Sequence, residues 1–407
     1  MKVLVTGAKG FVGRNLCESL KNIRDGKDRR GRFEALKPLE VCEYDVDGTP
    51  EELDAYCAEA DFVFNLAGVN RPKDSEDYMK GNFGFASELL ACLKRHGNAC
   101  PVMLSSSVQA TLRGRYAGSA YGKSKLAGEE LFFDYAARTG AKALVYRFPN
   151  LYGKWCRPHY NSAVATFCDA VANGRDFHVD DPSTKLELLY VDDLVQELLG
   201  ALLGEEHRCR YEGLRPVADE DGPYCYVPQT DVVTLGDIVG LLEEFKAARG
   251  SLNVPNVEEG SFSKKLYSTY ESYLEPENLS FQLAEHEDAR GSFTELLHTP
   301  DRGQVSVNVI KPGATKGQHW HHSKWEKFYV VSGEALVRVR KVGLDSSGGK
   351  YPAAEYRISD KDAMAVEIPP GYAHSIVNPS DSRDLVTIIW SNEVFDQENP
   401  DTYREEV

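Results

Sequence analysis

Short apolar segments alternate with longer segments of helical period through the N-terminal part of the chain. Residues 3–5 form an apolar strand pattern, and residues 11–20 repeat their apolar positions with the period of a helix. Strand-like and helix-like segments then alternate at residues 39–44, 50–59, 62–65, 83–96, 102–105, 124–139 and 143–146. Because such alternation produces parallel strands with helices on both faces, it predicts an α/β fold with a doubly wound parallel sheet.

The C-terminal part of the chain has the shorter period of a β-strand. Val305, Val307 and Val309 point to one side of an extended segment and have polar residues between them. Short strand patterns continue at residues 335–342, 355–358, 363–368 and 385–390. Many short strands separated by turn residues predict an all-β jelly-roll barrel.

Segments of weaker periodicity separate the two patterns. Residues 204–231 are charged, contain Gly and Pro, and are interpreted as a surface excursion. Thr234 and Asp237 are candidate caps for a helix that continues to Ala248. A chain of 407 residues is too long for one ordinary core, so two domains are expected. The predicted boundaries are a nucleotide-binding domain at residues 1–252, a linker at 253–285 and an all-β domain at 286–407.

Composition and charge exclude several classes of function. The sequence has 47 Lys and Arg against 63 Asp and Glu, which gives a formal net charge of −16. A surface this acidic repels nucleic acid and anionic lipid, so we expect neither as a partner. Nine scattered cysteines without a Cys-x-x-Cys pair are typical of reduced thiols, and the strand pattern beside Met1 leaves no room for a signal peptide. With no apolar run of membrane-spanning length, the sequence indicates a cytoplasmic protein.

A glycine-rich turn follows the first strand pattern. Small residues between a strand and a helix let the backbone approach a pyrophosphate, whose charge is stabilised at the helix N-terminus. The strand pattern at residues 62–65 is followed by Leu-Ala-Gly, which is expected to border the same crevice. The predicted cofactor-binding residues of these two segments are Gly7, Gly10, Phe11, Val12, Gly13, Leu66, Ala67 and Gly68.

Tyr121 and Lys125 carry the acid–base chemistry expected of this domain. They stand four residues apart in a helical segment and therefore share one face. A tyrosine titrates near pH ~10, and both an ammonium group and an oxidised nicotinamide favour its phenolate. Tyr121 thus becomes a workable proton donor or acceptor near neutrality. Ser107 ends a strand pattern and can hydrogen-bond a carbonyl group. A Tyr-x-x-x-Lys pair by itself is more often a surface pair.

Together these motifs resemble the extended short-chain dehydrogenase/reductase family, whose fold is Rossmann-like. The resemblance covers about the first 250 residues, with the family's motifs in order. The matching residues are Gly7, Gly10 and Gly13, then Asn65 to Gly68, Ser107, Tyr121 with Lys125, Arg147 to Gly153, and Tyr190 to Asp193. The resemblance implies a catalytic triad of Ser107, Tyr121 and Lys125. It also implies that Lys125 holds the cofactor ribose and that Asn150 lies in the substrate half of the cleft.

The residues leave the choice between NAD and NADP open. Asp45 stands near the end of the second strand pattern, where a carboxylate bonds a ribose 2′-hydroxyl group and favours NAD. Lys9 and Arg14 can instead bind a 2′-phosphate. A cationic run is a further candidate for that role, although a solvated loop is its more common interpretation. The run consists of Lys27, Arg29, Arg30 and Arg32.

The segment at residues 154–161 is rich in groups that bind a nucleotide sugar. An aromatic ring there can stack on a base, and a guanidinium group can pair with a diphosphate. An ordinary loop around a buried Trp is an equally good interpretation. The candidate substrate-binding residues are Asn150, Lys154 and Arg157.

Three histidines and one glutamate in the all-β segment form a candidate metal site. His319 and His321 stand two apart and face one side of a strand, while Glu326 and His374 belong to two further strand patterns. Three imidazoles and one carboxylate suit a borderline divalent ion such as zinc. The spacing resembles the two motifs of the cupin family, although Ala363 replaces the glycine that opens the second motif. The alternative is a barrel that keeps these residues as hydrogen-bonding core polars. The matching positions are Gly313, His319, His321, Glu326, Gly333, Pro369, Gly371, His374 and Asn378.

The whole chain resembles the bifunctional capsular-polysaccharide enzymes of the CapF type. Residues 66–72, 153–156 and 316–322 carry the likeness. It implies that the all-β domain epimerises C3 of a UDP-activated 4-keto-6-deoxy amino sugar, UDP-2-acetamido-2,6-dideoxy-hexos-4-ulose. The first domain then reduces C4 with NADPH, with NADH as the alternative. The implied product, UDP-N-acetyl-6-deoxy-L-talosamine, leads to UDP-N-acetyl-L-fucosamine, and a homodimer or higher homo-oligomer is expected.

Several alternatives stay open at the level of sequence. Lys327, His322 and Tyr372 are equal candidates for the base that removes the C3 proton. The rival function is a single-step nucleotide-sugar reductase, in which the barrel is a dimerisation and sugar-binding module. A redox-sensing binder without catalysis is disfavoured because the Tyr, Lys and Ser of the predicted triad are all present.

Overall fold

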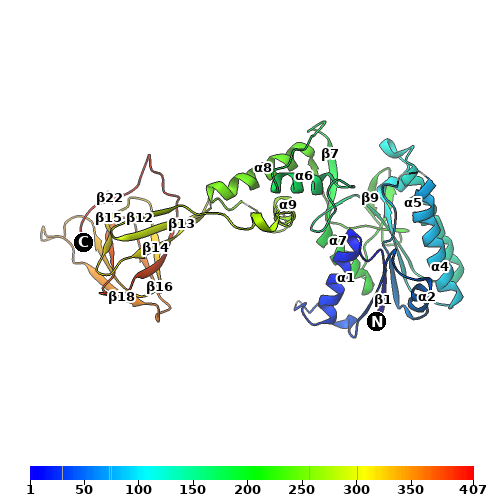
Figure 1. Ribbon diagram of the computed structural model, residues 1–407, viewed down its shortest axis with the longest axis horizontal. Coiled ribbons are helices and arrows are strands. Elements are labelled where there is room, and N and C mark those ends of the chain that lie inside the picture. Colours follow the sequence, from blue (N-terminus) through cyan, green and yellow to red (C-terminus); the bar gives the residue numbers. More distant parts are fainter. Residues whose placement is uncertain (30, 73, 75, 256, 300) are drawn as a thin grey trace. The chain divides into compact units, whose positions relative to one another are not determined.

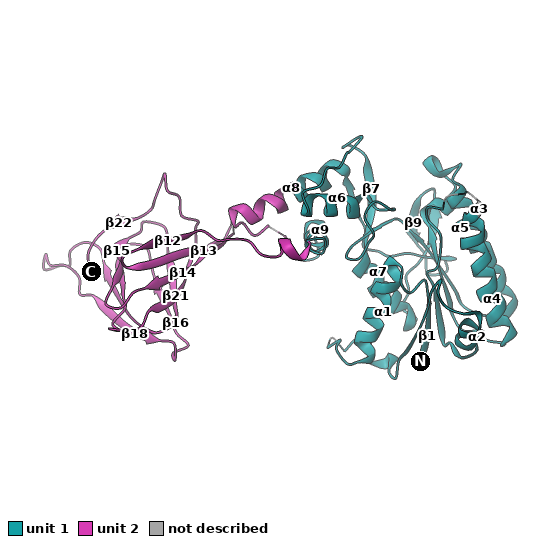
Figure 2. Cartoon of the chain, viewed as in Figure 1, with its two compact units in different colours: residues 1–242, 259–274 teal, residues 243–258, 275–407 magenta. Residues whose placement is uncertain are grey.

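The chain folds into two compact units (Figure 2). The computed structural model describes residues 1–29, 31–72, 74, 76–255, 257–299 and 301–407. The first unit contains residues 1–242 and 259–274, and the second contains residues 243–258 and 275–407. Part of the segment expected as a linker therefore belongs to the first unit, where it forms helix α9 (Phe262–Glu271).

Five parallel strands form the centre of the first unit (Figure 1). They are β1 (Lys2–Thr6), β2 (Glu40–Tyr44), β3 (Phe62–Asn65), β4 (Val102–Ser107) and β5 (Ala143–Phe148). Their order in the sheet is β2-β1-β3-β4-β5, and every neighbouring pair is parallel. Strand β2 lies on one side of β1, and β3 lies on the other side, so the direction of the strand order reverses at β1. A ligand crevice is expected at this point.

Helices cover both faces of this sheet, as the alternating pattern predicted. Val3 and Val5 share one apolar core with α1 and α7, whereas Leu4, on the other face of β1, shares a second core with α2, α4 and α5. The doubly wound Rossmann-like fold is therefore confirmed. The helices are α1 (Phe11–Arg24), α2 (Pro50–Glu59), α4 (Phe85–Arg95), α5 (Ala120–Thr139) and α7 (Val191–Leu202).

Three further strands extend the sheet beyond β5. They are β10 (Tyr224–Cys225), β8 (Arg208–Glu212) and β9 (Arg215–Ala218), in that order. Strand β10 is parallel to β5, and β8 is antiparallel to both of its neighbours. The interpretation of residues 204–231 as a surface excursion was therefore wrong for these strands. The charged residues of β8 alternate with buried Cys209 and half-buried Tyr211, and overall charge obscured this two-residue period.

The remainder of the first unit holds a small sheet, several helices and the first part of α8 (Leu235–Ser251), whose residues from Glu243 onward belong to the second unit. Helix α8 begins with the predicted caps, because Thr234 N donates to Asp237 Oδ2 at 2.9 Å and Asp237 N donates to Thr234 Oγ1 at 3.0 Å. The small sheet has the order β11 (Asp231–Thr234), β7 (Lys185–Tyr190), β6 (Asn150–Tyr152). The other α-helices are α3 (Glu76–Tyr78) and α6 (Ala163–Ala172), and η2 (Met79–Gly84) is a π-helix. The 3-10 helices of the first unit are η1 (Glu34–Leu36), η3 (Val108–Thr111) and η4 (Gly114–Tyr116). The second unit has the 3-10 helix η5 (Pro276–Asn278).

Two antiparallel sheets make up the all-β part of the second unit (Figure 1). The six-stranded sheet contains, in order, β12 (Glu285–Asp288), β13 (Gly291–Thr299), β14 (Gly303–Ile310), β21 (Leu385–Ser391), β16 (Glu326–Ser332) and β19 (Ala365–Ile368). The five-stranded sheet contains, in order, β18 (Ala354–Ser359), β17 (Glu334–Lys341), β20 (Tyr372–Val377), β15 (Thr315–Trp320) and β22 (Tyr403–Arg404). An apolar core that includes Ile310, Phe328 and Val337 draws on strands of both sheets. The all-β prediction is confirmed.

Two whole-chain properties accompany this fold. Within the described ranges, no helix combines the length and the apolar character that crossing a bilayer requires. All nine cysteines are free thiols, and eight of them are buried.

Candidate active site and candidate metal centre

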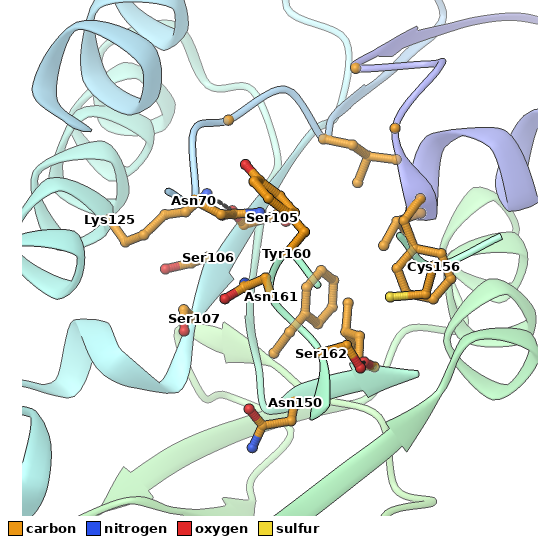
Figure 3. A pocket seen from close by; sticks show the side chains of 18 of the residues that line it. Asn70, Ser105, Ser106, Ser107, Lys125, Asn150, Cys156, Tyr160, Asn161 and Ser162 are labelled. Atoms are coloured by element: carbon orange, nitrogen blue, oxygen red, sulfur yellow. Dashed lines mark hydrogen bonds between the residues drawn. The ribbon is translucent and has the colours of Figure 1, made fainter. Parts of the chain in front are cut away.

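A cavity of about 470 Å³ lies at the carboxyl ends of β1, β3 and β4 (Figure 3). Figure 3 shows Lys125 and Ser107 on one side of it and Cys156 on the other. Three predicted residues, Asp45, Ala67 and Lys154, are not part of its lining. The predicted residues that do line the cavity are Gly7, Gly10, Phe11, Val12, Gly13, Leu66, Gly68, Ser107, Tyr121, Lys125, Asn150 and Arg157.

The glycine-rich turn has the geometry that a pyrophosphate needs. Gly7 has a φ of +69°, and a Cβ atom there would lie 2.7 Å from the Ala67 nitrogen. At Gly13, a Cβ atom would lie 2.1 Å from the Gly7 carbonyl oxygen. A side chain at either position would therefore force the turn apart. Helix α1 follows at once, no described side chain caps it, and its first turn has no acidic residue, so its N–H groups can receive an anion.

Tyr121, Ser107 and Lys125 meet at one wall of the cavity. Tyr121 and Lys125 lie one turn apart on α5, with the Lys125 Nζ atom 5.7 Å from the centre of the Tyr121 ring. The Lys125 ammonium group donates a hydrogen bond of 2.9 Å to the Ser105 carbonyl oxygen. The Tyr121 hydroxyl group is hydrogen-bonded to Ser107, the last residue of β4.

Burial sets the protonation states of this wall. Burial raises the pKa of Tyr121, and the hydrogen bond to Ser107 opposes that effect only in part. Burial lowers the pKa of Lys125 to about 8, against the opposite influence of Glu129. At neutral pH the wall therefore holds a protonated phenol close to an ammonium group. This is the state required of a proton donor whose phenolate product is to be stabilised.

Asn82, a buried residue that was not predicted from the sequence, supports this wall from behind. It lies in η2, and its amide group donates to Ser124 Oγ at 3.0 Å and to the Val69 carbonyl oxygen at 3.1 Å. Its Oδ1 atom accepts from Val69 N at 2.9 Å. Asn82 therefore ties the loop after β3 to α5, next to Lys125. A π-helix departs from the 3.6-residue period, so the periodic pattern gave no signal for this residue.

A buried ion pair supports the strand that ends at Ser107. The Arg147 Nε atom donates to Glu129 Oε1 at 2.8 Å, and Ser106 Oγ donates to the same oxygen at 2.5 Å. Arg147 also donates to the Tyr224 hydroxyl group at 2.9 Å. This network joins β4, α5, β5 and β10. Removing one partner of a buried pair typically costs about 3–5 kcal/mol because the other charge is left unpaired, so the wall depends on both Arg147 and Glu129.

The segments after β5 form the opposite wall. Asn150 and Arg157 both line the cavity, and the Arg157 guanidinium group lies 5.5 Å from the centre of the Tyr160 ring. Lys154 instead forms an ion pair with Asp192. This wall therefore offers an aromatic ring and a guanidinium group, which suit a base and a diphosphate.

Asp45 and two cations lie around the glycine-rich turn. Asp45 directly follows β2, and its carboxylate accepts a hydrogen bond of 2.7 Å from the Lys9 backbone N–H. The Lys9 ammonium group pairs with Asp47. The Arg14 guanidinium group lies 4.1 Å from the centre of the Trp155 ring, and Trp155 lines the cavity. The turn thus presents both the carboxylate that favours NAD and cations that can favour NADP.

The cationic run downstream of α1 forms ion pairs elsewhere. Lys27 lies 3.3 Å from Asp25, and Arg32 lies 3.0 Å from Glu205. Arg30 lies outside the described residues. These ion pairs favour the interpretation of the run as a solvated loop.

The four predicted metal ligands converge in the second unit. His319, His321, Glu326 and His374 each offer one donor atom, and these atoms lie within 4.8 Å of one another. Glu326 Oε2 lies 3.3 Å from His374 Nε2 and 3.6 Å from His321 Nε2. Bonds of about 2.0–2.2 Å to a tetrahedral zinc ion place donor atoms roughly 3.3–3.6 Å apart, so the spacing fits. The buried His321 Nε2 has no hydrogen-bond partner among the described residues, and a metal ion would satisfy it.

Two side chains of the cluster, His319 and Glu326, are held in forms that bind a metal ion. Burial lowers the pKa of His319 to about 4, and His374 and His321 act in the same direction. Burial pushes the pKa of Glu326 upward, but its interactions with His321 and His374 outweigh this and hold that pKa well below its ordinary value. Neutral imidazoles and an ionised carboxylate are the forms that bind a metal ion.

A second cavity, of about 390 Å³, opens beside these ligands. Its lining comes from both sheets of the second unit. The Lys316 ammonium group is engaged there, because it donates to Asn308 Oδ1 at 2.8 Å and to the Ser292 carbonyl oxygen at 2.9 Å. The polar residues of the lining include His286, Glu287, Asp288, Arg290, Asn308, Lys316, His319, Glu326 and His374.

None of the three candidate bases named from the sequence lines this cavity. Lys327 follows Glu326 in a strand, so it points to the opposite face, where it pairs with Glu367 at 2.8 Å. The His322 ring packs near Tyr403, and Tyr372 packs against the apolar core. His286 is the histidine of the lining that does not belong to the ligand cluster. His286 lies outside both histidine motifs, so their spacing gave no signal for it.

A further group of potential ligands occurs on the first unit, at Asp54, Cys92 and His96. Its carboxylate is already engaged, with Arg95 at 2.8 Å and the His96 Nε2 atom at 3.0 Å. We therefore assign no metal ion to this group.

The fold and the two sites define a class of protein. It is an oxidoreductase with a nucleotide-binding parallel sheet, joined to an all-β unit that carries a cluster of metal-ligand residues. Residues 3–208 match the NAD dependent epimerase/dehydratase family, and residues 286–403 match the polysaccharide biosynthesis C-terminal domain.

Relatives with both parts narrow this class. A UDP-2-acetamido-2,6-beta-L-arabino-hexul-4-ose reductase of Pseudomonas aeruginosa is 36% identical over 403 residues, which is 99% of this chain and 98% of the relative. The crystal structure of the capsular polysaccharide assembling protein CapF from Staphylococcus aureus is 42% identical, covers 100% of both chains and gives a TM-score of 0.84. A crystal structure of CapF with the inhibitor 3-isopropenyl-tropolone is 40% identical, also covers 100% of both chains and gives 0.80. The chain belongs to the CapF family of capsular polysaccharide proteins.

Proposed function

We propose that the two cavities act in turn on one UDP-activated 4-keto-6-deoxy amino sugar. The second unit epimerises C3 of UDP-2-acetamido-2,6-dideoxy-hexos-4-ulose. The first unit then reduces C4 with NADPH and gives UDP-N-acetyl-6-deoxy-L-talosamine, a precursor of UDP-N-acetyl-L-fucosamine. The observation that carries this proposal is the presence of two sets of reactive groups, a Tyr-Lys-Ser wall in one cavity and a His-His-Glu-His cluster beside the other.

The reduction follows from the wall formed by Tyr121, Lys125 and Ser107. A bound nicotinamide supplies the hydride for C4. Tyr121 is placed to give its proton to the C4 oxygen, because burial keeps the phenol protonated. The Lys125 ammonium group stabilises the phenolate that remains. Ser107, hydrogen-bonded to the Tyr121 hydroxyl group, is placed to orient the carbonyl oxygen. The name of the Pseudomonas relative, a 4-keto-sugar reductase, supports this half of the proposal.

The epimerisation follows from the acidity of a hydrogen beside a ketone. A divalent ion held by the His-His-Glu-His cluster, which we propose to be zinc, supplies Lewis-acid polarisation when bound. The chain's own part is to remove the C3 proton on one face of the sugar and return a proton on the other. His286 replaces Lys327, His322 and Tyr372 as the candidate base because it lines the cavity and they do not. A tropolone carries adjacent carbonyl and hydroxyl oxygens, a pair that chelates divalent ions, and a tropolone inhibits a related CapF.

A single-step reductase is the alternative function. The Pseudomonas relative is named for reduction alone. The outer face of β16 also exposes 38% of Tyr329 and 52% of Val331, as a dimerisation surface would. In this alternative the all-β unit binds the sugar and pairs two copies of the chain, and its histidines and glutamate serve stability. A homodimer is compatible with both functions.

Proton exchange at C3 separates the two functions. The chain is incubated with a UDP-4-keto-6-deoxy-HexNAc substrate in deuterated water, with and without NADPH, and the sugar is analysed by NMR. We expect deuterium at C3 without NADPH, and a reduced product with inverted C3 when NADPH is added. Reduction without any deuterium at C3 would leave the single-step reductase as the function.

A further inference from the structure

Residues 401–407 pack along the strand that carries the first metal ligand. Strand β22 pairs with β15, with Arg404 opposite His319 and Tyr403 opposite Trp320. The Glu405 N–H donates to the Gln318 carbonyl oxygen at 2.9 Å, and the Val407 N–H donates to Gln318 Oε1 at 2.8 Å. The segment therefore closes the hydrogen-bonding edge of β15 beside the ligand cluster.

Asp401 touches the second ligand directly through its backbone. Its carbonyl oxygen accepts a hydrogen bond from His321 Nδ1. A proton on Nδ1 leaves the lone pair on Nε2, the atom that lies 3.6 Å from Glu326 Oε2. The contact therefore selects the tautomer that presents Nε2 to the centre of the cluster.

The Asp401 carboxylate fixes the turn that follows His321. It accepts hydrogen bonds from the N–H groups of His322 at 2.8 Å, Ser323 at 2.8 Å and Lys324 at 3.0 Å. One residue thus holds both the imidazole ring and the backbone that leads away from it.

A buried arginine anchors the other end of this segment. Arg340, which is 5% exposed, pairs with Glu405 at 2.7 Å and donates to the Glu406 carbonyl oxygen at 2.8 Å. Arg340 belongs to β17, so the segment is anchored to the interior of the five-stranded sheet.

We propose that Asp401 is a positioning residue for the metal centre, and that residues 401–407 act as a clamp that fixes the tautomer and orientation of His321. The inference rests on the proposed function, since it requires a metal ion at the cluster. Groups that orient a metal ligand from behind typically contribute about 10–100-fold to metal affinity. The clamp supplies contacts to His321 where strand pairing does not, because His321 lies just beyond the end of β15.

Metal titration of the full chain tests the clamp. The apoprotein is titrated with Co²⁺, followed by visible absorption, and with Zn²⁺ in competition with a chromophoric chelator. Asp401→Ala removes the carboxylate that accepts from three backbone N–H groups, and it should weaken the binding of both ions about 10–100-fold. Asp401→Asn keeps one acceptor oxygen and should recover part of the loss. Asp396→Ala is the matched control, because Asp396 bonds the nearby Glu398 N–H at 2.8 Å and is not among the ligand contacts above.

The tautomer of His321 provides a readout that a general loss of packing does not move. Long-range ¹H–¹⁵N spectra of the apoprotein should show a single Nδ1–H tautomer, and a mixture of tautomers in Asp401→Ala. Equal metal affinity and an unchanged tautomer in Asp401→Ala overturn the clamp while the metal centre stands. If the wild-type chain binds neither ion, the proposed metal centre fails and the clamp fails with it.

If Asp401→Ala does not fold, the clamp is tested with Glu405→Gln instead. This change weakens the anchor at Arg340, at a residue that is not one of the four ligands. A drop in Co²⁺ affinity with an unshifted melting temperature supports the clamp. Unchanged affinity overturns it.

Discussion

The two cavities bury charge in opposite ways. In the first unit, Lys125 is a cation whose burial lowers its pKa to about 8, with Glu129 opposing the effect. In the second unit, Glu326 is a buried anion whose neighbours His321 and His374 hold its pKa well below the ordinary value. The first arrangement yields a group that can lose its charge near the working pH. The second yields a fixed charge, as metal binding requires.

Because the two cavities differ in this way, we expect that a substitution can abolish the reduction without the epimerisation, or the epimerisation without the reduction. Each cavity is lined by residues of a single unit. A change in one should therefore leave the chemistry of the other intact. The reaction of the unchanged cavity then serves as the internal control.

The largest effect is expected from Tyr121→Phe. This change removes the proton donor for C4, and a positioned acid or base contributes about 10²–10⁴-fold to a rate. NADPH oxidation should fall by that factor, while deuterium exchange at C3 continues. Both are measured on one sample, by absorbance and by NMR. Persistent NADPH oxidation would remove Tyr121 from its proposed role.

His319→Ala should have the opposite effect, with loss of exchange at C3 and retention of the reduction at C4. Loss of one imidazole ligand withdraws several kcal/mol of Lewis-acid stabilisation, so exchange at C3 should slow at least about 100-fold. Reduction of a substrate that is already epimerised should be unchanged. The matched control is Lys327→Ala, because Lys327 neighbours a ligand in the sequence but pairs with Glu367 and does not line the cavity. Exchange that survives in a metal-free His319→Ala protein would make the ion structural.

The rates of the two reactions should also depend differently on pH, although the effect is smaller. Lys125 is charged below its pKa of about 8 and neutral above it. Reduction, measured as kcat/KM for a pre-epimerised substrate, should therefore fall by about tenfold for each pH unit above 8. Exchange at C3 should not share this fall. In Lys125→Arg the side chain keeps its charge in this pH range, so any reduction activity of the variant should not fall above pH 8. A fall at the same pH in this variant would show that another group causes it.

The sequence predicted the parts of both sites that contiguous spacing encodes. Gly7, Gly10 and Gly13 lie within one turn, and Tyr121 and Lys125 lie within one helical turn, so local geometry alone places each set together. The histidine motif worked in the same way, because a strand puts residues two apart on one face.

Contacts that depend on long-range packing could not be predicted from local spacing in the sequence. Asp401 reaches His321 across eighty residues, and only strand pairing between β22 and β15 brings the two together. Asn82 sits in a π-helix whose period differs from that of α4. The orientation of Lys327 away from the cavity, by contrast, could have been predicted, because it follows Glu326 in one strand and neighbouring strand residues point to opposite faces.

The smallest effect is expected from Asp45→Asn, which sharpens the choice of cofactor. The carboxylate is held against the Lys9 backbone N–H at 2.7 Å, where it can bond a ribose 2′-hydroxyl group or repel a 2′-phosphate. Two charges about 4 Å apart in water interact by about 1 kcal/mol, so removing this one should raise the ratio of kcat/KM for NADPH to that for NADH about fivefold. The ratio is measured with both cofactors on wild type and variant. Lys9→Ala should move it in the opposite direction, since it removes a cation beside the same turn. A wild-type chain that strongly prefers NADH would refute the proposal of NADPH, and Asp45 would then be the residue that enforces that preference.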